Sequence, residues 1–304
     1  MRRFRGLLKR EWLEHGSTVA WGLGAVFALL LLSAAFTLYI DGSVDVELNV
    51  SQFSDSNVAG QQSDVQDGYI LGILAALALD VSGSTDLELQ AKIAIAQNAV
   101  AQPFLGVFLL LAGYILLSCL HDERKDHSVL FWKSMPVTDA QTVASKLIFV
   151  LGVAPLVVMV TTLLAQLLVI WLSVLALPDD AAGRIWMASQ FWLNPLRLTG
   201  GYLILGVWML PIAGWLMLVS SLAKRAPGLW ALGIPWGLSL LESIVFGSNV
   251  LSELMMQHLR LLPVATISTG ALSTLGNPNI WFGILIACGF LALTVVCRRR
   301  YNTL

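Results

Sequence analysis

The side chains of this sequence that could do chemistry gather between His121 and Lys146, where a charged stretch precedes a short apolar and aromatic one. A Pro-Val-Thr turn follows at residues 136–138. A rigid apolar knob beside charged groups is suited to docking a soluble partner, because buried aromatic side chains carry much of the binding energy at interfaces. The alternative is an ordinary interfacial loop. The residues that we expect to make the contact are Glu123, Arg124, Val129, Leu130, Phe131, Trp132, Pro136, Val137 and Thr138.

One acidic residue, Glu242, lies inside a long apolar run. It could face a translocated substrate, or it could make a hydrogen bond between helices or lie near a membrane interface. Carriers driven by protons or ions usually place several acids or histidines at the middle of the membrane. A single acid therefore disfavours secondary transport.

The motifs of common catalytic sites are absent. No Gly-Lys dipeptide occurs, so the chain lacks the phosphate-binding loop of P-loop ATPases. Neither HExxH nor GxSxG is present, and the four histidines share no metal-ligand spacing. We therefore expect no catalytic residue, no metal site and no cofactor in this chain, and we do not expect it to be an enzyme.

The composition indicates a membrane protein. Apolar residues make up 57% of the 304 residues and charged residues 12%, and the mean hydropathy is +0.77, well outside the range of soluble domains. Several apolar runs reach the roughly 20 residues that a helix needs to cross the bilayer. We expect an all-α integral membrane protein with a single transmembrane domain over residues 1–304. Its six predicted spans are residues 19–40, 103–120, 147–177, 199–222, 228–246 and 280–297.

Three segments outside these spans have a character of their own. Residues 1–18 interleave Arg and Lys with apolar side chains, which predicts an amphipathic elbow helix on an anionic leaflet. Residues 41–102 form an acidic insertion in which the apolar stretch 69–79 is too short to cross. A capping box at residues 85–88 predicts an amphipathic helix leading to Pro103. Residues 121–146 form the third segment, a charged loop.

The positions of the 18 Lys and Arg residues predict the orientation. Most of them lie in residues 1–18, in the loop 121–146, at Lys224 and Arg225, and at the C-terminus, whereas Lys92, Arg184, Arg197 and Arg260 lie on the other side. Because cytoplasmic loops are rich in Lys and Arg, both termini and the loop 121–146 are predicted to be cytoplasmic and the insertion extracytoplasmic. The net charge of −1 and the scattered basic residues indicate no nucleic-acid partner.

The loop resembles the loop between the second and third spans of permease subunits of type-2 ATP-binding-cassette transporters. That family's loop reads roughly Glu-Arg, a Leu-rich stretch, Ser-x-Pro-Val-Ser/Thr, and a Lys in the following span. The likeness extends to six spans and a cytoplasmic N-terminus. The chain departs from the family at His127-Ser128, where Gly-Thr is frequent, and in its larger insertion after the first span. The matching residues are Glu123, Arg124, Ser134, Pro136, Val137, Thr138 and Lys146.

The resemblance implies how such a chain works. The loop would form a coupling helix in a groove of a separate ATP-binding subunit, which holds ATP and Mg²⁺, with the elbow packed beside it. Two permease copies, or this chain and a sister permease, would form a dimeric translocation path among the lipids of the bacterial cytoplasmic (inner) membrane. The apolar spans favour export of a lipophilic or amphipathic substrate. The rival hypothesis is a membrane scaffold or assembly factor without transport, whose insertion recruits extracytoplasmic partners.

Overall fold

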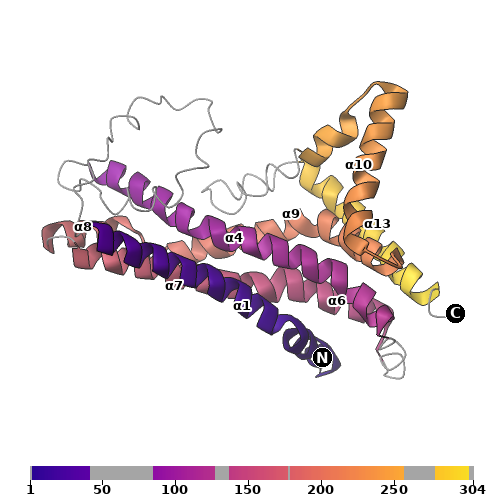
Figure 1. Cartoon of the computed structure of the whole chain (residues 1–304), viewed down its shortest axis with the longest axis horizontal. Coiled ribbons are helices and arrows are strands. Elements are labelled where there is room, and N and C mark those ends of the chain that lie inside the picture. Colours follow the sequence, from indigo (N-terminus) through magenta and orange to yellow (C-terminus); the bar gives the residue numbers. More distant parts are fainter. Residues whose placement is uncertain (1, 42–84, 127–136, 177–178, 257–277, 301–304) are drawn as a thin grey trace. The chain divides into compact units, whose positions relative to one another are not determined.

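The computed structural model describes residues 2–41, 85–126, 137–176, 179–256 and 278–300. The predicted all-α fold is confirmed for these residues, which form eight α-helices, one π-helical segment and a further helical stretch over 250–256 (Figure 1). The apolar stretch 69–79 and the residues from Val129 to Pro136 lie outside the described residues. The elements are α1 (Arg2–Asp41), α4 (Asp86–Lys125), α6 (Asp139–Ile148), the π-helical segment η1 (Phe149–Val153), α7 (Ala154–Ala176), α8 (Asp179–Ala188), α9 (Asn194–Leu222), α10 (Pro227–Phe246) and α13 (Pro278–Arg300).

Five helical stretches of the described residues are long and apolar enough to cross a membrane. Each of them overlaps one of the second to sixth predicted spans, so a multi-pass membrane protein follows from helix length and hydropathy. The first predicted span, residues 19–40, lies within α1 and stays a prediction. The five stretches are Asp86–Lys125, Asp139–Leu172, Pro195–Leu222, Pro227–Phe246 and Ile280–Arg300.

The N-terminal helix corrects one predicted boundary. We expected an elbow over residues 1–18 and a separate span over residues 19–40, but α1 continues unbroken from Arg2 to Asp41. The reason is local, since residues 2–41 contain no proline and their glycines are isolated. An isolated glycine lowers helix stability by about 1 kcal/mol without ending the helix.

Helix α4 corrects the end of the predicted insertion 41–102. The capping box is present, because the backbone N–H of Thr85 donates to Glu88 Oε2 at 3.0 Å and that of Glu88 donates to Thr85 Oγ1 at 3.4 Å. The helix then continues through Pro103 into the predicted second span. A membrane helix tolerates the donor lost at a proline. At 40 residues α4 is about 60 Å long, twice the hydrocarbon thickness, so it extends beyond the bilayer.

The predicted loop 121–146 is shorter than expected. Helix α4 continues to Lys125 and α6 begins at Asp139, so helix covers both ends of the predicted loop. Thr138 is the N-cap of α6 in a reciprocal capping box with Gln141. The hydrophobic pattern missed this start because α6 is polar in its first turns.

The third span is interrupted by a π-helical segment. We expected it to cover residues 147–177, but the helical path runs through α6, η1 and α7 from Asp139 to Ala176. A π-helical turn takes up one extra residue within an α-helix. Phe149 and Val150 of η1 are buried, so the extra residue is accommodated without exposing these side chains.

The described contacts divide the chain into two compact units, each described by itself. Unit 2 covers residues 23–106 and 160–195. In it, Leu89 and Ile93 of α4 pack against Ile185 and Ala188 of the ten-residue helix α8. The side chain of Gln97 donates to the carbonyl of Ser189 at 3.0 Å and fastens the end of α8 to α4. The single-domain prediction over residues 1–304 concerns the whole chain and stays a prediction.

Unit 1 covers residues 1–22, 107–159 and 196–304, and in it α9 packs closely on α13. At Gly214 of α9 an added Cβ would lie 3.2 Å from Phe290 Cβ and 3.3 Å from the carbonyl oxygen of Ala287. In contrast, Gly233 and Gly237 of α10 have open space where a Cβ would be. The glycines of α10 therefore make no close helix contact among the described residues, whereas Gly214 does.

This difference gives a paired test. Gly214→Val should lower the free energy of unfolding by about 1–3 kcal/mol, because backbone of α13 limits the room for repacking. Gly237→Val is the matched control, since it adds the same side chain to an exposed helix. Unfolding in detergent by SDS titration measures both. Equal losses would contradict the packing of α9 on α13.

Candidate functional site

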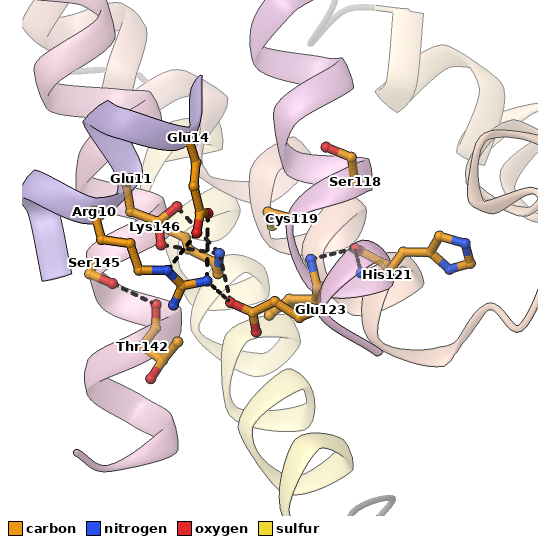
Figure 2. A network of polar contacts seen from close by, with 12 residues as sticks. Arg10, Glu11, Glu14, Ser118, Cys119, His121, Glu123, Thr142, Ser145 and Lys146 are labelled. Atoms are coloured by element: carbon orange, nitrogen blue, oxygen red, sulfur yellow. Dashed lines mark hydrogen bonds and ion pairs between the residues drawn. The ribbon is translucent and has the colours of Figure 1, made fainter. Parts of the chain in front are cut away.

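A cluster of seven charged side chains in unit 1 connects α1, α4, α6 and α13, and we call it the charge cluster. Figure 2 labels five of its members, from α1, α4 and α6. Its polar contacts bring together residues that are far apart in the sequence. Positions 10 and 123, for example, and positions 123 and 298 are joined directly. Its members are Arg10, Glu11, Glu14, Glu123, Asp139, Lys146 and Arg298.

Glu123 is the centre of the charge cluster. Its Oε1 lies 2.9 Å from Arg10 Nη2 of α1 and 3.1 Å from Lys146 Nζ of α6. Its Oε2 lies 3.0 Å from Arg298 Nη1 of α13. Figure 2 shows the guanidinium of Arg10 extending toward this carboxylate. One carboxylate of α4 is therefore bound by cations from three other helices.

Each of these three cations has a second carboxylate. Lys146 pairs with Glu11 at 3.1 Å, Arg10 with Glu14 at 2.7 Å, and Arg298 with Asp139 at 3.0 Å. The charge cluster thus contains four carboxylates and three cations, so the charges nearly balance. Near balance is what permits burial, because an unpaired ion loses several kcal/mol of hydration in the interior.

The inner members are almost completely removed from solvent. The side chains of Glu123, Lys146 and Glu11 are 6%, 2% and 1% exposed. Burial raises the pKa of Glu11, and the ammonium of Lys146 opposes this shift. Lys146 therefore stabilises the charged form of a carboxylate that burial would otherwise neutralise.

Arg124, the residue after Glu123, connects α4 to a fifth helix. Its Nη2 donates to the carbonyl oxygens of Ser220 and Ala223 at 2.6 and 2.8 Å. These groups lie at the end of α9, where the helix itself offers its last carbonyls no donors. Ser220 Oγ adds to the contact by donating to the carbonyl of Leu117 at 2.6 Å. The Glu123-Arg124 pair thus fastens α4 to α1, α6, α9 and α13.

The structure brings together part of the predicted docking set. Glu123 and Arg124 lie in the last turn of α4, engaged within the chain, and Thr138 caps α6. Val137 is half-buried just before this cap. The stretch from Val129 to Pro136 lies outside the described residues, so its docking role stays a prediction.

The carboxylate of Glu242 caps the chain that follows its own helix. It accepts hydrogen bonds from Ser248 Oγ at 2.8 Å, from the N–H of Val250 at 3.0 Å and from the N–H of Leu251 at 2.9 Å. These donors open the helical stretch 250–256. The contacts favour the interpretation of Glu242 as a hydrogen-bonding residue near a helix end over a role in a translocation path.

The sequence analysis did not predict the charge cluster, although it counted the three cations among the charges that set the orientation. Arg10, Lys146 and Arg298 were interpreted as positive charges that set orientation, and Glu11 and Asp139 were not singled out. A signal exists, because Glu11 follows Leu7 and precedes Gly16 and Val19 on the buried face of α1. An acid on the apolar face of a helix calls for a buried cation.

Three side chains of α1 could in principle hold a metal ion, since ligand atoms of Glu11, Glu14 and His15 lie within 4.8 Å of one another. However, Glu11 is paired with Lys146 and Glu14 with Arg10. A divalent cation would have to displace or approach these two positive groups. The arrangement fits an ion-pair network better than a metal centre.

Comparisons of the chain with protein families, with curated proteins and with solved structures found no match. The residues themselves therefore carry the functional argument.

Neutralising the centre of the charge cluster should destabilise the fold. Glu123→Gln leaves buried Lys146 and half-buried Arg10 and Arg298 without their shared counter-charge, and we expect about 3–5 kcal/mol less unfolding free energy. Asp122→Asn changes an exposed neighbour and should stay within about 0.5 kcal/mol of the wild type. SDS unfolding in mixed micelles measures both. A Glu123→Gln variant as stable as Asp122→Asn would show that the ion pairs do not hold the helices.

His15 should make the stability depend on pH. Burial lowers the pKa of His15, and the charge of Lys146 lowers it further. The unfolded chain, with a histidine pKa near about 6.5, therefore binds the proton more tightly than the folded protein. Stability is complete above about pH 7 and falls as the pH drops through about 6. The melting temperature should fall less between these pH values in His15→Gln than in the wild type, and equal falls would contradict the lowered pKa of His15.

Proposed function

We propose that the chain is the membrane-spanning permease subunit of an ATP-binding-cassette transporter in a bacterial cytoplasmic membrane. A separate ATP-binding subunit docks on the stretch between α4 and α6 and drives transport. Two permease subunits, either two copies or this chain and a sister chain, form the translocation path. The proposal joins the multi-pass helical architecture to the resemblance of residues 123–146 to the loop of such permeases.

The observation that carries the proposal is the attachment of both sides of this stretch to several spans. Before it, Glu123 and Arg124 bind groups of α1, α6, α9 and α13. After it, Asp139 of α6 pairs with Arg298 of α13. A partner that displaces the stretch therefore acts on several membrane helices together. A coupling element needs such a connection to the membrane helices, because a loop that is not bound to them would move without displacing them.

Features of the sequence and of the exposed surface support the proposed energy source and substrate class. The sequence has no Walker A loop, so ATP and Mg²⁺ are assigned to the partner. Large apolar side chains are exposed along several spans, Trp230 and Trp236 of α10 among them. Such surfaces can contact lipid, and they can bind a lipophilic or amphipathic substrate that enters from the lipid. We propose export as the direction.

The rival function, a scaffold that recruits extracytoplasmic partners through the insertion 41–102, explains less. A scaffold would bind its partners through the insertion, and its function would not require any particular structure at the predicted cytoplasmic loop 121–146. It gives no reason for a buried cluster of charges at the base of that loop, where desolvation is costly. Co-purification distinguishes the two functions, since only the permease requires an ATPase with a Walker A motif, encoded for instance in a neighbouring reading frame.

The partner contact can be tested at a single aromatic side chain. Trp132→Ala should weaken binding of the co-purified ATPase about thirtyfold, as expected for a buried aromatic anchor worth about 2 kcal/mol. It should also reduce transport in reconstituted vesicles. Trp192→Ala is the matched control, because Trp192 is 81% exposed and lies on the predicted opposite side of the membrane.

Two results would overturn the proposal. One is that the Trp132→Ala variant binds the ATPase and supports transport as well as the Trp192→Ala variant does. The other is maleimide labelling of a cysteine at position 132 from outside intact cells, which would place the stretch on the wrong side for an ATPase.

A further inference from the structure

We infer that Arg298, in the last turn of α13, is a positioning residue that fixes the start of α6 relative to the end of α4. The inference deepens the proposed function and rests on it for its consequence. The geometry itself concerns three described side chains. Arg298 Nη1 lies 3.0 Å from Glu123 Oε2 of α4, and Arg298 Nε lies 3.0 Å from Asp139 Oδ1 of α6.

The two carboxylates flank the proposed docking stretch. Glu123 lies in the last turn of α4, which ends at Lys125, and Asp139 is the first residue of α6. A single guanidinium therefore binds the carboxylates on both sides of the stretch. Its side chain is 9% exposed, against 21% for Asp139, so solvent screens the contacts little.

The chemistry of arginine suits this task. A guanidinium is planar and carries its donors in a fixed fork, so two bound carboxylates take a defined relative position. A lysine ammonium is a point charge on a flexible stem and defines no such geometry. Arg298 can therefore set a separation, which charge compensation alone would not require.

A second attachment shows why Arg298 matters for α6. Lys146 of α6 also pairs with Glu123, but it lies seven residues, about two turns and 10 Å, beyond Asp139. Lys146 lies near the end of α6 that continues into η1, so on its own it leaves the first two turns of α6 without an ion pair to α4. A second attachment at Asp139 fixes the direction of these turns. Without Arg298, α6 would be held to α4 through Lys146 and could turn at its start, directly after the docking stretch.

For the proposed transporter this makes the end of α13 part of the coupling apparatus. With Arg298 in place, the end of α4, the start of α6 and the last turn of α13 move as one body when the partner acts. Without Arg298, part of the displacement would turn the start of α6 and would not reach the other helices. We therefore expect weaker coupling in transport and a looser docking site in the same variants.

The separation can be measured in the full-length protein without any partner. Spin labels at the exposed positions Lys125→Cys and Ala140→Cys report it by dipolar electron paramagnetic resonance, with Cys119, Cys288 and Cys297 replaced by alanine. Arg298→Gln should broaden the distance distribution, and Arg298→Lys should broaden it less. Arg299→Gln is the matched control, because Arg299 is the exposed neighbour in the same helical turn, and it should leave the distribution unchanged.

A second variant protects the test against misfolding. Asp139→Asn removes one arm of the bridge and leaves Glu123 with Arg10, Lys146 and Arg298. It should also broaden the distribution, and its combination with Arg298→Gln should add nothing further, since both changes break the same bridge. If Arg298 merely stabilised the fold, the two substitutions would lower the free energy of unfolding additively. They would leave the distance distribution between the spin labels unchanged.

The outcomes separate this inference from the proposed function. Distributions of Arg298→Gln and Asp139→Asn that match Arg299→Gln overturn the inference, whatever the partner does. A broadened distribution in a chain to which no ATPase binds supports the positioning role and rejects the proposed function. If both hold, Arg298→Gln should also weaken ATPase binding about tenfold while Arg299→Gln does not.

Discussion

The arrangement of unit 1 depends on one buried carboxylate. Glu123 sits among Arg10, Lys146 and Arg298, which come from α1, α6 and α13. Such a group is costly to desolvate and adds less stability than apolar packing of the same volume would. What it adds is direction, because a carboxylate accepts charged hydrogen bonds at defined positions. Apolar spans can slide or rotate past one another in lipid at little cost, and a shared ion removes that freedom.

The order Glu-Arg at positions 123 and 124 follows from helix geometry. Consecutive residues of an α-helix point about 100° apart, so one pair of neighbours serves two sides of α4. Glu123 faces the cations of three helices, and Arg124 faces the carbonyls at the end of α9. Both side chains are thereby engaged inside the chain. The proposed docking of a partner would then rest on the stretch that follows them.

The sequence predicted the extent of the last three apolar helices well and the polar interior poorly. The hydropathy of α9, α10 and α13 marked their extent to within a few residues. The capping box at Thr85 correctly marked the start of α4. The pattern failed where helices leave the apolar region, as in α1 and α6, because polarity there does not end a helix. It also failed for Glu11, because which cation pairs with a buried acid is a property of tertiary packing.

The packing of the spans shows which helices are connected through the charge cluster and Arg124. Helix α10 is largely exposed, and its one buried residue, Ala231, accepts a hydrogen bond from Trp215 of α9 at 3.0 Å. Helix α9 is the most buried of the five candidate spans, and α13 packs closely on it at Gly214. Arg124 holds the end of α9 and Arg298 the end of α13. A displacement at the end of α4 would therefore act on α9 and α13 through these two side chains. Helix α10 would follow α9 through the hydrogen bond of Trp215 to Ala231, while most of its apolar side chains are exposed.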